Sequence, residues 1–348
     1  MDVRLSPEQQ QLRTAAARLA QRLGPGTVAG LDDARRRGQL ASAIEAAGWR
    51  ELRSPDEAGA PVASAVEVCL VAEELARALC DVAFAGPVLA SELRRRAGAA
   101  DAPGRETVLL DPALAALAVV ATGDVPNGLA VDSAGARGAL VVCADAAGTR
   151  LGWVEIEPTA VHVDLTRPTS VPTRAAVVPI DGTRGLSNED LAACTALGLA
   201  LSCADLVGVM GGAVELGRSY AVERKQFGRP IGSFQAVAHM LADAWVAVEG
   251  ARSVALHAAW SVDVLAPHDA CAAGWLAKAY CARAARQVCE TVIQVHGGIG
   301  NTWDCLAHVF LRRALLSSDL FGSADACMTR LLGHRGVTVT AGSEHGLR

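Results

Sequence analysis

The chain has 348 residues, of which 51% are hydrophobic and 20% are charged, and its formal net charge is −5. This composition predicts large buried cores in two or three structural units, and the scattered Lys and Arg residues give no basis for nucleic-acid binding. The charged start Met1-Asp2-Val3-Arg4 carries no signal-peptide pattern. The apolar run over residues 113–122 is about half the length that a membrane span needs. We therefore expect a cytoplasmic protein with no membrane role.

Cysteine and histidine spacing gives no pattern typical of a metal site or a disulfide framework. The ten cysteines include no C-x-x-C pair, and the eight histidines include no H-E-x-x-H pair. Cysteine also packs as a small apolar residue inside helical cores. We therefore expect most of these thiols to be buried and free, and we expect no metal site.

The first 104 residues have the pattern of a helical domain. Ser6 and Gln9 form a capping-box sequence around Pro7, which suits the first position of a helix. Apolar residues at helical spacing predict further helices over residues 32–47 and 65–78.

Residues 105–183 have a different texture and predict a small β domain. Short β-branched runs are separated here by Gly, Pro and Asp, notably at 139–143, 152–156 and 175–179.

Residues 184–348 return to helical spacing and predict a four-helix bundle. The predicted helices run from a cap at Ser187 to about Phe227, from near Ser233 onward, over residues 268–295, and from Thr302 onward. The whole chain is thus predicted to be an α+β protein that is mainly α.

Two segments at helix junctions combine cations, amides and glycines. The first, residues 224–235, reads R-K-Q-F-G-R-P-I-G-S-F-Q, with Ser233 placed to cap a new helix whose start would attract an anion. Arg224 would add a bidentate contact to a phosphate. The second, residues 294–300, reads Q-V-H-G-G-I-G, where three glycines allow close approach of a ligand. Spacing alone also allows the simpler interpretation that both are inter-helix turns and that His296 is a hydrogen-bonded core residue.

Together the two segments resemble the acyl-CoA dehydrogenase family, which carries R-x-x-F-G-x-x-I-x-x-F-Q followed by Q-x-H-G-G-x-G in this order and separation. The resemblance covers the predicted bundle and extends weakly to residues 48–52 and 72–77. It fails between 105 and 183, where the family's T-E-P-x-x-G-S-D and W-I-T-N-like stretches are missing.

The resemblance implies FAD as the cofactor, held across a subunit interface by its diphosphate and adenosine. The residues that match the family's FAD-binding positions are Arg224, Phe227, Gln235, Gln294, Gly297 and Gly298.

The family uses a glutamate base at either of two positions, and the resemblance places these at Phe321 and Gly198. Neither residue accepts a proton, so no usual catalytic base is expected in this chain. Asp205 and Asp325 are the nearest carboxylates in the sequence and are the remaining candidates.

These departures resemble the short partner subunits of heteromeric acyl-CoA dehydrogenases from bacterial steroid breakdown. The resemblance implies an acyl-CoA substrate, steroid-like or branched, a longer homologue that supplies the glutamate, and an electron-transfer flavoprotein as acceptor, in steroid catabolism or fatty acid β-oxidation. Two alternatives stay open: a non-catalytic interaction subunit without flavin, and a flavin-dependent oxidase or monooxygenase of the same fold.

Overall fold

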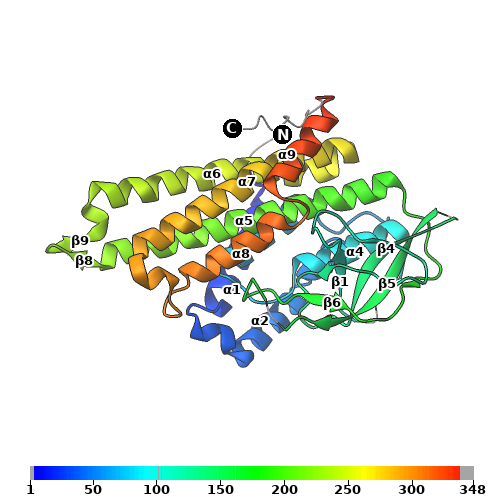
Figure 1. Cartoon of the computed structure of the whole chain (residues 1–348), viewed down its shortest axis with the longest axis horizontal. Coiled ribbons are helices and arrows are strands. Elements are labelled where there is room, and N and C mark those ends of the chain that lie inside the picture. Colours follow the sequence, from blue (N-terminus) through cyan, green and yellow to red (C-terminus); the bar gives the residue numbers. More distant parts are fainter. Residues whose placement is uncertain (1–3, 101, 103, 147, 161, 338–348) are drawn as a thin grey trace, which may run out of the picture.

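The computed structural model describes residues 4–337 except 101, 103, 147 and 161. Long helices form one body, and a small sheet packs beside them together with the N-terminal helices (Figure 1). The predicted α+β, mainly helical fold class is confirmed.

The N-terminal part is helical, as predicted. Ser6 caps its first helix with the reciprocal Gln9 contacts of a capping box, and Gly24 ends it. The helices of this part are α1 (Pro7–Leu23), α2 (Ala34–Ala46), α3 (Ala65–Arg77) and α4 (Ala85–Ala97), with short 3-10 turns η1 (Ala29–Asp32) and η2 (Trp49–Glu51).

The central part is a small barrel-like sheet. Its strands are β1 (Glu106–Leu110), β2 (Val119–Ala121), β3 (Leu129–Ala130), β4 (Gly138–Asp145), β5 (Gly148–Pro158), β6 (Ser170–Pro172) and β7 (Val178–Pro179). They lie in the order β2-β4-β1-β3-β6-β5-β7, and an extra β4–β5 pairing closes β4, β1, β3, β6 and β5 into a ring. Small apolar side chains such as Ala139, Val141 and Val154 fill it. The predicted strands over residues 139–143 and 152–156 are confirmed as parts of β4 and β5. Of the predicted run 175–179, only the last two residues form a strand, β7.

The C-terminal part is built on long helices. They are α5 (Asn188–Glu223), α6 (Gln235–Val264), α7 (Pro267–His296), α8 (Ala307–Asp319) and α9 (Ala324–His334), with η3 (Ile231–Ser233) and η4 (Gly297–Asn301) between them. Ser187 caps α5 as predicted.

Two predicted features of the first bundle junction are wrong. Helix α5 ends at Glu223 rather than near Phe227, because the next residues pair as the hairpin β8 (Lys225–Gln226) and β9 (Arg229–Pro230). Ser233 does not cap α6, because its hydroxyl donates to the carbonyl of Pro230 at 2.7 Å and Phe234 occupies the cap position.

Helix α5 is enclosed by the rest of the fold. It contacts α3, α6, α7 and α8, and all of its residues from Ala196 to Val214 are buried. By length and composition α5 is also apolar enough to cross a membrane, which the sequence reading overlooked. Because 94% of its most apolar window is buried inside the fold, α5 is the core helix of the bundle.

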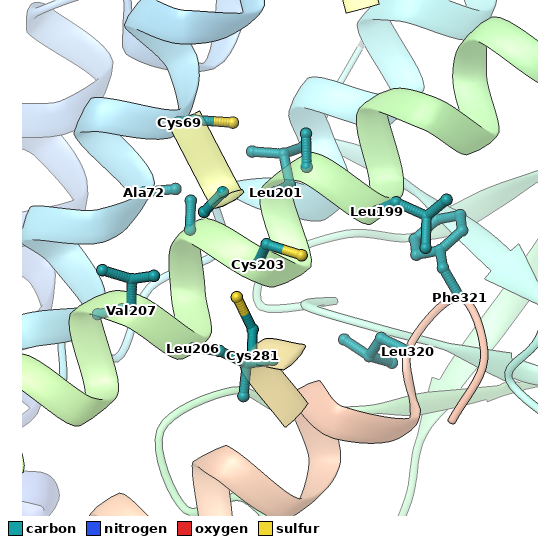
Figure 2. Packing of buried hydrophobic residues seen from close by; sticks show 14 of the residues in the cluster. Cys69, Ala72, Leu199, Leu201, Cys203, Leu206, Val207, Cys281, Leu320 and Phe321 are labelled. Atoms are coloured by element: carbon teal, nitrogen blue, oxygen red, sulfur yellow. The ribbon is translucent and has the colours of Figure 1, made fainter. Parts of the chain in front are cut away.

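All ten cysteines are buried and free, as predicted. Cys203 of α5 and Cys281 of α7 lie close together where the two helices pack (Figure 2). The contact with Cys203 and burial together raise the pKa of the Cys281 thiol well above its usual value. Cysteine here packs as a compact apolar side chain.

Two glycines of α5 allow α3 to approach closely. A Cβ atom built on Gly208 would lie 2.1 Å from the carbonyl oxygen of Glu73, and one on Gly212 would lie 2.1 Å from that of Arg77. Backbone oxygens of a packed helix cannot retreat as a flexible side chain does. The distance between α3 and α5 is therefore set by the absence of side chains at these positions.

We predict that Gly212→Ala lowers the free energy of unfolding by about 1–3 kcal/mol or more, because the new methyl group meets the α3 backbone. Gly38→Ala in α2 is the matched control, since nothing lies within 4 Å of a Cβ at this position. Helix propensity makes that change neutral or stabilising by up to about 1 kcal/mol. Denaturant unfolding of both variants tests the prediction, and equal stability of the two would contradict it.

Candidate flavin half-site and closed cleft

The segment after α5 is an exposed two-residue β-hairpin. Lys225 pairs with Pro230 and Gln226 with Arg229 around the turn formed by Phe227 and Gly228. Both turn residues have positive φ, 52° at Phe227 and 78° at Gly228, as a type I′ turn requires. The Phe227 side chain is 93% exposed, so an aromatic ring stands in solvent on a backbone conformation that glycine normally adopts.

The second predicted segment lies at the same end of the bundle. Helix α7 ends at His296, whose ring stacks on Tyr220 near the end of α5 with ring centroids 4.4 Å apart. The His296 Nδ1 atom lies 2.8 Å from the Val292 carbonyl oxygen, so His296 is a hydrogen-bonded core residue, as the simpler interpretation held. This stack fixes the start of the glycine turn beside the hairpin (Figure 1).

The predicted flavin-binding residues share one property: all are exposed at this end. They are Arg224, Phe227, Gln235, Gln294, Gly297 and Gly298. Arg224 has no described ion-pair partner, and nothing lies within 4 Å of a Cβ placed on either glycine. An unpaired guanidinium, two free amides and bare backbone suit a diphosphate and its attached nucleoside. The residues present therefore fit FAD.

Gly198 and Phe321, the two positions at which the resemblance predicts a base, meet in the fold. A Cβ on Gly198 would lie 2.3 Å from the Phe321 ring, so the ring fills the space above this glycine. Phe321 is only 2% exposed and lies against α5 beside Leu199 (Figure 2). The Phe321 ring can therefore occupy this space only because residue 198 is a glycine.

The cleft around these residues is nearly filled. It has a volume of about 40 Å³ and is lined by apolar residues such as Leu75, Leu89 and Leu201 together with Phe321. A single water molecule needs roughly 10–15 Å³ of such space, so the cleft admits a few waters and no acyl chain.

A buried lysine holds the Phe321 turn. Phe321 has a φ of 61°, and the Lys278 ammonium of α7 donates to the carbonyls of Leu320 and Gly322 on either side of it, at 3.0 Å for Gly322. Lys278 has no exposed surface, and burial lowers its pKa. Sequence reasoning missed Lys278, although its place on the apolar stripe with Gly274 and Cys281 was a usable signal.

Asp205, one of the two remaining base candidates, lies in a buried ion-pair network under the cleft. Its carboxylate lies 2.6 Å from Arg313, 3.5 Å from Arg167 and 2.6 Å from the Ser317 hydroxyl, which donates to it. Burial by itself raises the pKa of Asp205, but the two guanidinium groups outweigh burial and hold the pKa below its usual value. A carboxylate held this way is a poor proton acceptor.

The same network joins all three parts of the fold. Arg313 of α8 donates to the carbonyl of Cys80 at 3.0 Å and to the hydroxyl of Thr166 at 2.9 Å. Arg167 pairs with Asp164 at 2.7 Å within the loop that follows β5. Hydrogen bonds and ion pairs at the floor of the cleft therefore connect the N-terminal helices, the β domain and the bundle.

Asp325 and Asp132 are two further carboxyl groups that could act as a base. Asp325 is exposed and pairs with Arg283 at 2.8 Å, outside the cleft. Asp132 lines the cleft, and burial raises its pKa, but one of its oxygens accepts the backbone N–H groups of Phe84 and Gly86 at the start of α4. Sequence reasoning missed Asp132, whose geometry is that of a helix cap supplied by a distant segment.

The exposed end and the closed cleft are far apart. Gly198 and Glu223 are separated by 25 positions of one helix, which corresponds to about 38 Å at 1.5 Å per residue.

Solved structures share this architecture. The fold is similar to a chain of the ChsE4-ChsE5 complex from Mycobacterium tuberculosis, with a TM-score of 0.81 at 23% identity, covering 98% of this chain and all (100%) of that chain. It is also similar to a chain of the Tcur3481-Tcur3483 steroid ACAD, with a TM-score of 0.79 at 24% identity over 94% and 98% of the two chains. The fold is thus that of the acyl-CoA dehydrogenase class of flavoproteins.

Sequence comparisons identify the family. Models of the acyl-CoA dehydrogenase N-terminal and C-terminal domains match residues 6–97 and 196–336. The chain is 31% identical over 341 residues to the acyl-CoA dehydrogenase IpdE2 of Mycobacterium tuberculosis, covering 93% of this chain and 96% of that protein. The chain therefore belongs to the acyl-CoA dehydrogenase family, whose members are oxidoreductases acting on CH–CH bonds.

The contact between Gly198 and Phe321 gives a test by double-mutant cycle. Gly198→Ala alone should lower the free energy of unfolding by about 1–3 kcal/mol, because its methyl group meets the ring. Phe321→Leu frees part of that space, so Gly198→Ala in its presence should cost at least about 1 kcal/mol less. Denaturant unfolding of the four proteins measures this coupling, and strictly additive costs would show that the two residues do not share the space.

Proposed function

We propose that the chain is the subunit of a heteromeric FAD-dependent acyl-CoA dehydrogenase that completes the flavin site of a longer partner subunit. The observation that carries the proposal is the contrast between the two ends of α5. One end presents a cation without a described ion-pair partner, exposed amides and bare backbone, whereas the other end buries Phe321 against Gly198.

At the open end this chain's residues would bind and orient the cofactor. Arg224 would hold the diphosphate by two parallel hydrogen bonds, and the backbone at Gly297 and Gly298 would let the nucleoside approach. The amides of Gln235 and Gln294 would donate to phosphate or ribose oxygens. When bound, FAD supplies the acceptor for the hydride that leaves the acyl β-carbon.

At the closed end this chain would leave the chemistry to its partner. Removal of an α proton from an acyl thioester requires a general base next to the substrate. The filled cleft offers no room for substrate, and its carboxylates have structural roles, since Asp205 is ion-paired and Asp132 caps α4 through one oxygen while its Oδ1 has no described partner. The partner is therefore a longer homologue that retains its glutamate.

The substrate class follows from family membership and from the relatives. Acyl-CoA esters with a steroid-like or branched acyl group are proposed, because one structural neighbour is described as a steroid ACAD. We further propose action in the cytoplasm with an electron-transfer flavoprotein as acceptor. Two-chain assemblies of similar fold, such as the ChsE4-ChsE5 complex, support the heteromeric arrangement.

We predict that the chain produced alone retains little FAD, whereas co-production with a longer, glutamate-retaining homologue gives a yellow complex. Addition of an acyl-CoA substrate should bleach the flavin band of that complex. The measurements are flavin absorbance per chain and anaerobic bleaching. A complex without flavin despite added FAD would favour a non-catalytic interaction subunit, and oxygen consumption by the reduced flavin would favour an oxidase.

A second prediction isolates the diphosphate contact. In the complex, Arg224→Ala should weaken FAD retention at least about tenfold, because a charge-assisted contact to a phosphate is lost. Arg218→Ala is the matched control, since it removes the same side chain two turns earlier, where Arg218 pairs with Glu215 in solvent. Helical content, measured by circular dichroism, should be unchanged in both variants. Equal FAD retention by the two variants would remove Arg224 from the site.

A further inference from the structure

A large cavity lies among the N-terminal helices, on another face of α4 from the closed cleft. It has a volume of about 500 Å³ and opens between α2, η2, α4 and the segment leading into β1. Its wall carries three arginines, three glutamates and two serines, namely Arg50, Arg94, Arg105, Glu45, Glu51, Glu106, Ser54 and Ser91. A volume of this size falls within the range of small-molecule sites.

One of these arginines is buried without a counter-ion. Arg50 is only 4% exposed, and its Nε donates to the carbonyl of Ala83 at 2.7 Å. Its Nη2 atom is buried and has no hydrogen-bond partner. No described carboxylate lies within ion-pair distance of Arg50. Such an arrangement is costly for a guanidinium unless an anion completes it.

Asp132, Glu51 and Glu45 each act to raise the pKa of Arg50, but no described ion pair joins any of these carboxylates to it. Glu106 is already paired with Arg94, whose Nε and Nη2 atoms donate to its two carboxylate oxygens at 2.6 and 2.9 Å. Glu45 is 69% exposed and lies 3.7 Å from Arg105. Burial and the like charge of Arg105 both lower the pKa of Arg50, and both arginines line the cavity.

We propose that this cavity is a binding site for a small oxyanion, a carboxylate or phosphate group, held by Arg50 and Arg105 with hydroxyl contacts from Ser54 and Ser91. A planar or tetrahedral oxyanion placed between two guanidinium groups relieves their repulsion and accepts their free N–H groups. Pro87 and Ala90 on the same wall leave room for an apolar part of the ligand. The site is separate from the proposed flavin half-site and goes beyond the proposed function.

The test is calorimetric titration of the full chain with inorganic phosphate and, separately, with acetate, at constant ionic strength maintained with chloride. Saturable binding of either anion is expected, and the better ligand identifies the phosphate or the carboxylate class. Arg50→Gln and Arg105→Gln should each weaken binding at least about tenfold. Arg105 is 27% exposed, so its replacement keeps the test valid even where a change at Arg50 disturbs folding.

Two controls make the outcome specific. Arg35→Gln removes a positive charge from the exposed face of α2 and should leave binding unchanged. Arg224→Ala should also leave it unchanged, which separates this site from the proposed diphosphate site. Absence of saturable binding up to tens of millimolar, or equal weakening by Arg35→Gln, would overturn the proposal.

Discussion

Enclosure of α5 on all sides is the constraint on which the rest of the fold depends. A helix this apolar is stable in water only when other elements cover it, and α3, α6, α7 and α8 do so. The close passage of α3 requires bare backbone at Gly208 and Gly212. Because the helix runs straight from the cleft to the hairpin, it also fixes the separation between the closed end and the exposed end.

Buried charge sets the rigidity of the closed end. The carboxylate of Asp205 and the guanidinium groups of Arg167 and Arg313 satisfy one another while each residue is only 4–6% exposed. Removing one member of such a cluster leaves an uncompensated charge, which typically costs about 3–5 kcal/mol. The cleft is therefore a cross-linked part of the core, in contrast to the N-terminal cavity, where Arg50 lacks such compensation.

Local signals in the sequence predicted most of the elements, and long-range contacts account for the errors. The caps at Ser6 and Ser187 are short-range patterns, and both are present in the structure. The end of α5 was misplaced because Phe227 at positive φ follows from hairpin pairing, which side-chain periodicity does not report. The sequence identified Gly198 and Phe321 as two separate positions that lack the expected glutamate. Their contact joins positions 123 residues apart, so only the fold reveals it.

That contact has a consequence for how the chain can change over time. A carboxylate at position 198 needs the volume that the Phe321 ring occupies, so the ring must shrink first. Shrinking it alone opens a core cavity, and a Phe to Ala change of this kind typically costs about 3–5 kcal/mol. Recovery of a carboxylate at position 198 therefore passes through a poorly folded intermediate, whereas a carboxylate at position 321 would replace the ring itself. The contact thus works against recovery of a base at position 198 and, in the proposed assembly, preserves dependence on a partner.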